Sequence, residues 1–438
     1  MVFNSPVFLF AFLPLSLLAY HVLPGRRCKN AFLIAASLVL YAFGNVRHLA
    51  LLLGSAVAHY LAGLAMLRWQ KCRKPVLTVT VALDVALLLG CKLAGWLPLG
   101  VSFFTFQAIS YVVDLYRNPA DGSRNFREVL QYITFFPQLV SGPLMKFSAA
   151  RQCMEAKADA ADVAEGMTRF AVGLAKKLLL SAAAASVADA VFGLSVGDLD
   201  IRTAWLGALC YTLQIFFDFS GYSDMAIGLG RMFGYTLPEN FRYPYIASSV
   251  SDFWRRWHIS LSTWFRDYLY IPLGGNRKGK TRTILNKLIV FFATGLWHGV
   301  TLPFLIWGLL HGVFVAVETA FGLPKKLEKK WYGHIYTLLA VVLTFVFFRA
   351  ATAAQAVSMI GSMFAGFSLS SAGTLLLTHE LGLRTVFFLL LGCVLSTPLV
   401  SKVRLPVWTV WVLTLLLLAL CILTLASSSF VPFIYFQF

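Results

Sequence analysis

The chain has 438 residues, of which 59% are hydrophobic and only 13% are charged, and its mean hydropathy is +0.74. Soluble domains carry roughly 25% charged residues, so this composition excludes an ordinary soluble fold and indicates an integral membrane protein. The net charge of +18 reflects basic residues that cluster in short loops between apolar runs. That is the positive-inside pattern of membrane proteins, and it argues against a nucleic-acid partner.

Apolar runs follow one another along almost the whole chain, and a membrane-spanning helix needs ~20 such residues. In chain order the predicted spans are 6–23, 30–43, 47–67, 76–94, 168–190, 203–218, 284–297, 301–320, 333–349, 383–400 and 406–426. Three shorter or more polar stretches are predicted to be re-entrant, interfacial or tilted pieces: 100–116, 128–140 and 351–367. No polar linker separates these runs, so residues 1–438 are predicted to form a single polytopic membrane domain.

The basic loops set the predicted topology. Loops with Lys and Arg at 26–29, 68–74, 117–127, 277–282, 324–330 and 402–404 are predicted to lie in the cytoplasm. With these loops inside, 100–116 must also cross and both termini lie outside, which requires an even number of crossings, about twelve. The N-terminus lacks the basic start of a cleaved signal peptide, so the first run is expected to remain as a membrane segment.

The segment 251–271 is polar and aromatic. As one helix it would place these residues on one face: Trp254, Trp257, His258, Leu261, Trp264, Phe265 and Tyr268. The other side would carry Arg255, Arg256, Ser262, Arg266 and Asp267. Such an amphipathic helix lies in the membrane interface, where tryptophans and arginines are ordinary anchors. Anchoring does not explain the histidine on the aromatic face, which points a titratable imidazole inward.

His298 lies between two apolar runs, in a stretch from 289 to 314 that contains no Lys, Arg, Asp or Glu. A titratable side chain at membrane depth costs free energy and marks a candidate functional site. A neutral imidazole can act as a general base on a hydroxyl; the alternative is a structural histidine bonded to a neighbouring helix. His311, in the next apolar run, is predicted to be structural or to support His298.

Other chemistries lack their motifs. The sequence holds no HExxH, P-loop or GxSxG pattern, and the spacing of glycines at 228–234 does not match a nucleotide-binding loop. A metal site on His258 and His298 would need a third ligand. Asp252 and Asp267 lie off the predicted histidine-bearing face, so no metal is predicted.

Seven stretches in order along nearly the whole chain carry recognisable motifs. They are FNSPVFLFAFLPL (3–15), PLGVSFFTFQAISYVVDLYRN (98–118), FFPQLVSGPLMKFS (135–148), FDFSGYSDMAIGLGRMFGY (217–235), WRRWHISLSTWFRDYLYIPLGGN (254–276), GLWHGV (295–300) and FIYFQF (433–438). In these stretches the chain resembles the membrane-bound O-acyltransferase family, in the bacterial branch typified by the alginate O-acetylation protein. The family's near-invariant histidine falls on His298, and its second, more variable polar position falls on His258.

The resemblance implies an all-α fold with about eleven to twelve tilted helices in a ring around a central tunnel, plus re-entrant or interfacial helices. It implies a cytoplasmic acyl thioester as donor, acetyl-CoA or an acyl carrier, with no bound cofactor. The acceptor would be an extracytoplasmic polysaccharide, reached with the help of an SGNH-type partner protein. The location implied is the bacterial inner membrane, where lipid surrounds the helices.

Roles for the candidate residues follow from the resemblance and from their chemistry. His298 is predicted to be the general base on the acceptor hydroxyl, and His258 to orient the donor or to donate to the developing oxyanion. The predicted tunnel walls are Trp254, Trp257 and Trp297. Arg255, Arg256 and Arg266 suit the phosphates of CoA, although lipid headgroups offer the same charge.

Other functions remain open at this stage. Transfer of D-alanine from a carrier protein to teichoic acid is the closest rival, because that branch shares the paired histidine motifs. A non-catalytic transporter would use the histidines as a proton relay. A purely structural membrane scaffold would leave both buried histidines unexplained.

Overall fold

The computed structural model describes residues 2–403 and 405–427. These ranges form helices and loops without any β-strand, which confirms the predicted all-α class. Residues 428–438, with the FIYFQF motif and the predicted external C-terminus, lie outside the described residues. The described residues divide into two compact units, 2–174 with 222–239 and 425–427, and 175–221 with 240–403 and 405–424. The single polytopic domain stays a prediction.

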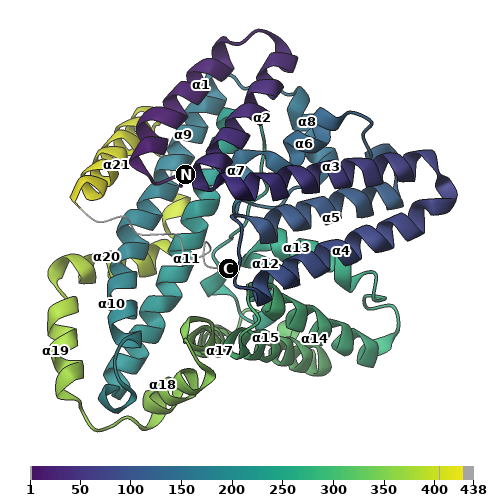
Figure 1. Cartoon of the computed structure of the whole chain (residues 1–438). Helices are drawn as coiled ribbons and strands as arrows, with labels where there is room; N and C mark the ends of the chain where they lie inside the picture. The colour runs from purple at the N-terminus through teal and green to yellow at the C-terminus, as the bar shows by residue number, and fades with distance from the viewer. Residues whose placement is uncertain (1, 404, 428–438) are drawn as a thin grey trace. The chain divides into compact units, whose positions relative to one another are not determined.

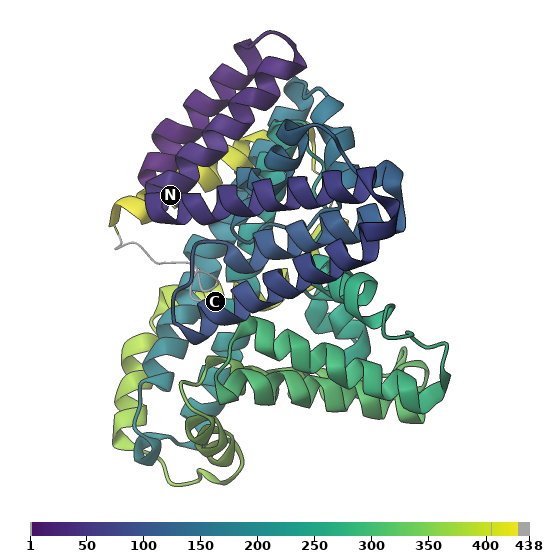
Figure 2. The same ribbon diagram turned by 45° about the vertical axis from the view of Figure 1, so that its right-hand side comes forward.

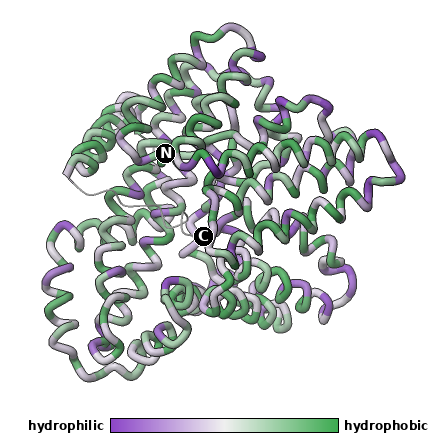
Figure 3. The backbone as a smooth tube through the Cα atoms, viewed as in Figure 1, coloured by the Kyte–Doolittle hydropathy of each residue, from purple (hydrophilic) through white to green (hydrophobic). Residues whose placement is uncertain are grey.

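The first unit is built mainly from the N-terminal helices. They are α1 (Leu13–Val22), α2 (Gly25–Gly44), α3 (Val46–Arg68), α4 (Arg73–Leu93), α5 (Val101–Arg117), α6 (Phe126–Thr134), α7 (Phe136–Leu139), α8 (Phe147–Glu155) and α9 (Ala160–Ala175). Helices α3, α4 and α5 lie side by side (Figure 1). Hydrophobic residues follow α3 and α4, and hydrophilic ones gather at the turn between them (Figure 3), as expected for two helices buried in lipid.

The second unit holds every candidate site residue. Its helices are α10 (Ala182–Phe192), the first part of α11 (Ile201–Met232), α12 (Val250–Arg256), α13 (Ile259–Phe265), α14 (Gly279–His298), α15 (Leu302–Phe321), α16 (Leu323–Leu327), α17 (Trp331–Arg349), α18 (Ala353–Ala365), α19 (Ser371–Glu380), α20 (Leu383–Leu395) and α21 (Val407–Ser427). Helices α14 and α15 form a long antiparallel hairpin (Figure 2). The short α12 packs on α15 and α17 through Val250, Val315 and Ala340.

Helices occupy every stretch that the sequence predicts to enter the membrane. By length and composition, six helical stretches can cross a membrane: Val46–Arg68, Gln70–Leu93, Ala160–Phe192, Leu302–Phe321, Trp331–Arg349 and Val407–Ser427. The pair α19 and α20, bent by 81° at its break, would make a seventh. A multi-pass membrane protein is therefore confirmed, whereas the predicted count of about twelve crossings is not.

The segment 251–271 is not the single helix that the sequence predicts. Helix α12 ends at Arg256, Trp257 is extended, and His258 adopts a left-handed conformation with φ 45° before α13 begins at Ile259. The prediction of a continuous helix is therefore wrong at its centre. On the predicted aromatic face, Trp257, His258, Leu261, Trp264 and Phe265 are buried, whereas Trp254 and Tyr268 are half-buried. Asp267, expected on the polar side, is also buried.

The break at His258 has a local cause. The Asn240 side-chain oxygen accepts hydrogen bonds from the Ser260 backbone N–H and hydroxyl, at 3.1 and 3.0 Å, and the Asn240 carbonyl accepts from the Ile259 N–H. These bonds replace the helical partners of residues 259 and 260. They offset the left-handed backbone of a non-glycine residue, which costs about 1–2 kcal/mol.

Candidate active site

His298 is the last residue of α14, and a close helix crossing fixes its place. A Cβ on Gly308 of α15 would lie only 2.9 Å from the Gly295 Cα and 2.5 Å from the Phe291 carbonyl oxygen. Paired glycines therefore let the two backbones approach more closely than any larger residues would allow. His298 follows Gly295 by one helical turn and is 3% exposed. Helix α14 ends there, because Gly299 is extended.

Three aromatic rings surround the His298 imidazole. Their centroids lie 4.7 Å away for Trp297, 5.0 Å for Trp307 and 5.0 Å for Phe348, and all three meet the imidazole at steep angles. The rings exclude water from the imidazole and hold it by shape.

His258 lies on the other side of Trp297. Its ring packs edge-on against Phe219, at 4.5 Å, and contacts the Trp297 ring at a centroid distance of 6.3 Å. Trp297 thus contacts both imidazoles. The two histidines that the sequence singles out, forty residues apart in the chain, are brought together around this one indole.

The hydrogen bonds of His258 fix which nitrogen carries the proton. Its Nδ1 lies 3.2 Å from the Asn240 Oδ1, and that atom is an oxygen because the Ser260 backbone N–H donates to it. Nδ1–H therefore donates, and Nε2 of the neutral ring keeps a lone pair. Burial lowers the pKa of His258 to about 3, so the ring is neutral at physiological pH. In this tautomer the neutral ring presents an acceptor at Nε2 and directs its N–H to Asn240.

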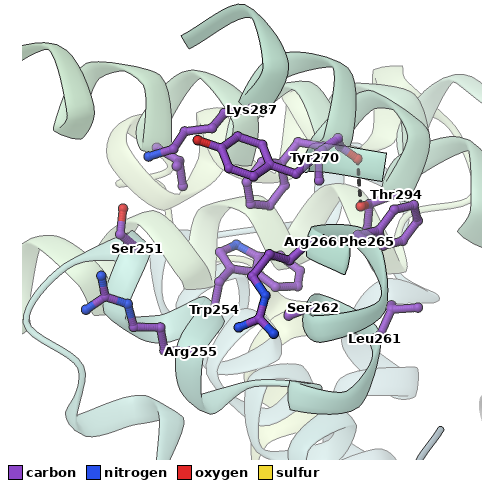
Figure 4. A pocket seen from close by; sticks show the side chains of 13 residues that line it. Ser251, Trp254, Arg255, Leu261, Ser262, Phe265, Arg266, Tyr270, Lys287 and Thr294 are labelled. Carbon is purple, nitrogen blue, oxygen red and sulfur yellow. Dashed lines mark hydrogen bonds between the residues drawn. The ribbon is translucent and has the colours of Figure 1, made fainter. Parts of the chain in front are cut away.

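A cationic cavity of about 270 Å³ opens beside this centre. Its walls come from α12, α13, α14, α15 and the turn after α13: Ser251, Trp254, Arg255, Leu261, Ser262, Phe265, Arg266, Tyr270, Lys287, Val290, Phe291, Thr294 and Val315. Figure 4 shows Lys287 on one wall and Arg255 and Arg266 on the opposite one. Arg255 and Lys287 bring positive charge to a space whose remaining lining is largely aromatic and aliphatic, and the Arg266 guanidinium is paired with the Asp267 carboxylate at 2.9 Å. The arrangement suits an anion with an apolar extension.

The structure divides the predicted lining residues into two groups. Trp254, Arg255 and Arg266 line the cavity. The residues outside its lining are Arg256, Trp257 and Trp297. The Arg256 guanidinium donates to the Asp252 carboxylate at 3.0 Å, and Trp257 packs in an aromatic core against Phe253 and Phe345.

Trp254 connects the cavity to the histidine centre. Its indole N–H donates to the His311 Nδ1 at 3.2 Å, so the His311 proton lies on Nε2 and is donated to the Thr344 hydroxyl at 3.0 Å. The Trp254 ring also contacts Trp307, at 5.9 Å, and Trp307 in turn contacts His298. His311 thus holds Trp254 in place through two hydrogen bonds, in keeping with the structural or supporting role predicted for it.

Two charged residues that the sequence analysis did not single out also shape this site. The Glu318 carboxylate, fully buried on α15, accepts the backbone N–H groups of Val250 at 2.6 Å and Ser251 at 2.8 Å, which pins the start of α12. Lys287 lines the cavity and donates to the Thr319 hydroxyl at 2.6 Å. Lys287 is the only charged residue in the predicted span 284–297, and Glu318 is the only one in the predicted span 301–320. A single charge inside an apolar span is the sequence feature that could have identified both residues.

No group of three or more His, Cys, Asp or Glu side chains with metal-binding geometry occurs in the part of the chain that the structure describes.

Comparison with known proteins places this site in a family. The model of the membrane-bound O-acyltransferase family matches residues 99–323, which include both histidines and the whole cavity lining. The chain belongs to this family. It is therefore a multi-pass membrane O-acyltransferase, as the sequence resemblance predicts.

Individual relatives agree with the predicted branch. The probable alginate O-acetylase AlgI of Pseudomonas putida is 38% identical, and the match covers the full length of both chains. The peptidoglycan O-acetyltransferase of Helicobacter pylori is 35% identical over 83% of this chain and 80% of its own length. The teichoic acid D-alanyltransferase of Bacillus subtilis is 30% identical over 57% of this chain and 66% of its own length. The resemblance to the alginate-type branch of the membrane-bound O-acyltransferases is thus confirmed.

Proposed function

We propose that this O-acyltransferase moves an acetyl group from acetyl-CoA to a hydroxyl of an extracytoplasmic polysaccharide. The observation that carries the proposal is the placement of His298 in a water-excluding aromatic box, linked through Trp307 and Trp254 to a cationic cavity. Such a site can hold a neutral base and an anionic thioester donor within one group of helices. The named activities of the Pseudomonas and Helicobacter relatives support O-acetylation as the reaction.

The proposed step is an acyl transfer with His298 as general base. The acceptor hydroxyl attacks the thioester carbonyl carbon while its proton moves to the His298 imidazole. A C–O bond forms, and the carbonyl electrons move onto oxygen in a tetrahedral intermediate. The intermediate collapses, the C–S bond breaks, and the departing thiolate takes the proton from the imidazolium. The products are the O-acetyl ester and CoA thiol.

The donor would be held by the cavity beside Trp254. Arg255, Arg266 and Lys287 supply three cations for the phosphates of CoA, and Trp254, Phe265 and Phe291 supply apolar surface for the rest. His258, with its Nε2 lone pair, would accept a hydrogen bond from the donor and so orient it. No cofactor bound to the enzyme takes part in this scheme.

The cellular arrangement belongs to the same proposal. The enzyme would lie in the bacterial inner membrane with its basic loops in the cytoplasm and both termini outside. The donor would enter a central tunnel from the cytoplasm, and the acetyl group would leave on the other side. An SGNH-type extracytoplasmic partner would complete transfer to the polysaccharide.

D-alanyl transfer from a carrier protein is the second candidate, favoured by the similarity to the Bacillus teichoic acid D-alanyltransferase. Both reactions use a thioester and a hydroxyl, so His298 would serve either. The cationic cavity favours CoA, because its phosphates are part of the donor itself.

The test measures base-labile esters on extracellular polymer from cells that express wild type, His298→Ala or His379→Ala at matched membrane levels. His379 is the control, because its side chain is 82% exposed on α19. Acetate released from wild type and His379→Ala, but not from His298→Ala, is the expected result. Equal acetate from all three would remove the catalytic role of His298, and D-alanine in place of acetate would establish the second candidate.

A further inference from the structure

Acyl transfer at His298 needs a hydrogen-bond donor as well as a base. Negative charge develops on the carbonyl oxygen in the tetrahedral intermediate, and donors aimed at that oxygen stabilise the transition state. The two histidines nearest the box do not supply such a donor. His258 keeps a lone pair on Nε2, and His311 uses Nε2–H on Thr344 and Nδ1 on Trp254.

Trp307 is a neighbouring side chain with a suitable group. Its indole is 1% exposed, and its ring meets the His298 imidazole at 5.0 Å and 90°. The Trp307 Nε1–H is buried and has no hydrogen-bond partner among residues 2–403 and 405–427. The indole N–H groups of Trp254 and Trp205, by contrast, donate to His311 and to the Met363 carbonyl. A buried donor without an acceptor costs free energy, and this donor is therefore available to an acceptor from outside the chain.

We propose that the indole N–H of Trp307 donates a hydrogen bond to the carbonyl oxygen of the bound acyl thioester, and that this bond strengthens as the tetrahedral intermediate forms. The inference rests on the proposed function, since it names the group that stabilises the charge produced when His298 activates the acceptor hydroxyl. The carbon–oxygen double bond becomes a single bond at this step, and the new oxyanion accepts the Trp307 N–H until the C–S bond breaks. Trp307 is thus a catalytic residue, beside His298 as base.

The packing around Trp307 keeps the indole in one orientation. Phe348 contacts its ring at 4.8 Å, His311 at 5.2 Å and Trp254 at 5.9 Å. Gly308, the next residue, forms the close crossing with Gly295 that also positions His298. The base and the donor are therefore fixed by the same contact between α14 and α15, and little reorganisation is needed as charge develops.

The first test compares Trp307→Phe with Trp205→Phe in the purified full-length enzyme, with acetyl-CoA as donor. Both changes keep an aromatic ring and remove one indole N–H, but the Trp205 donor is already used by Met363. The expected result is a kcat about 100-fold lower for Trp307→Phe, with KM and thermal midpoint close to wild type. Trp205→Phe should keep the wild-type kcat. A Trp307→Phe enzyme that folds and turns over at the wild-type rate would overturn the proposal.

A second measurement does not depend on the folding of that variant. Acetyl-CoA labelled with ¹³C at the thioester carbonyl is bound to His298→Ala, and its carbonyl stretch is recorded by difference infrared spectroscopy. A hydrogen bond from Trp307 lowers the stretching frequency below that of the same donor in water-free solvent, and the added Trp307→Phe change restores it. An unshifted band in His298→Ala overturns the role of Trp307. Turnover of acetyl-CoA by His298→Ala, by contrast, would count against the proposed function itself.

Discussion

His59 in the first unit and His298 in the second both lie in apolar helices, yet their neighbours differ in kind. His59, on α3, has its Nε2 2.9 Å from the Asp84 carboxylate of α4 and its Nδ1 2.8 Å from the Ser55 carbonyl oxygen. His298 instead contacts three aromatic rings. The first environment fixes an imidazole with polar partners that permanently belong to the chain. The second surrounds an imidazole with aromatic rings, and the proposed function assigns to it the exchange of a proton with a substrate.

The difference shows that depth in the membrane does not by itself identify a catalytic histidine. Both residues are buried, His59 at 2% exposure and His298 at 3%, and both lie within or beside predicted spans. The rule that a titratable side chain at membrane depth is functional applies equally to each. The chemistry of the neighbours separates them: a carboxylate on the adjacent helix is typical of a structural pair, and a ring of aromatic residues beside a binding cavity is typical of a reaction site.

Replacing His298 by Ala should give the largest effect on activity. Loss of a general base lowers kcat about 1,000-fold, because the acceptor hydroxyl then has to lose its proton to water. The thermal midpoint in detergent should change little. Steady-state kinetics with purified wild type and His298→Ala check the expectation, and a His298→Ala enzyme within tenfold of wild type would contradict it.

Replacing His59 by Leu should give the opposite pattern. The change leaves Asp84 buried, at 7% exposure, without its imidazole partner, and breaking a buried pair in this way costs about 3–5 kcal/mol. Thermal unfolding should therefore shift to lower temperature, while kcat per folded molecule stays at the wild-type value.

The control for His59 is a double change, His59→Leu with Asp84→Leu. It removes both polar groups, so most of the lost stability should return. If His59→Leu instead lowered kcat as His298→Ala does, the distinction between the two histidines would fail.

The sequence could predict whatever depends on neighbours along the chain. Apolar length predicted the helices, and the seven motif stretches along the chain predicted the family. The break at His258 could not be predicted, because it depends on Asn240, eighteen residues away and brought close only by folding. The same holds for contacts between separate helices. They are the His59–Asp84 pair, the hydrogen bonds of Glu318 to the start of α12, and the position of Lys287 in the cavity wall. The sequence alone does not show which isolated charged residues come into contact in the fold.

Protonation of His258 should make the free energy of unfolding depend on pH, and this effect is smaller than those of the His298 and His59 changes. Burial lowers its pKa to about 3 in the folded protein, whereas an unfolded histidine titrates near pH ~6.5. The unfolded chain therefore binds the proton first as pH falls. Stability is fully present above pH ~6.5 and is lost towards pH 3, by about 2 kcal/mol at pH 5. Unfolding measured from pH 7 to pH 5 should show this slope in wild type and His379→Asn but not in His258→Asn, and equal slopes in all three would exclude His258 as its source.

Removing a cation from the cavity should give the smallest effect, a change in KM for one donor and not for the other. Lys287→Gln removes a charge that faces Arg255 and Arg266, and we expect the KM for acetyl-CoA to rise about tenfold with kcat unchanged. S-acetylpantetheine carries the same thioester without phosphates, so its KM should be the same in Lys287→Gln and wild type. The control is Lys325→Gln, at an exposed position on α16. An equal rise in KM for both donors would mean that Lys287 acts through its hydrogen bond to Thr319. The cavity would then no longer be assigned as the binding site of the CoA phosphates.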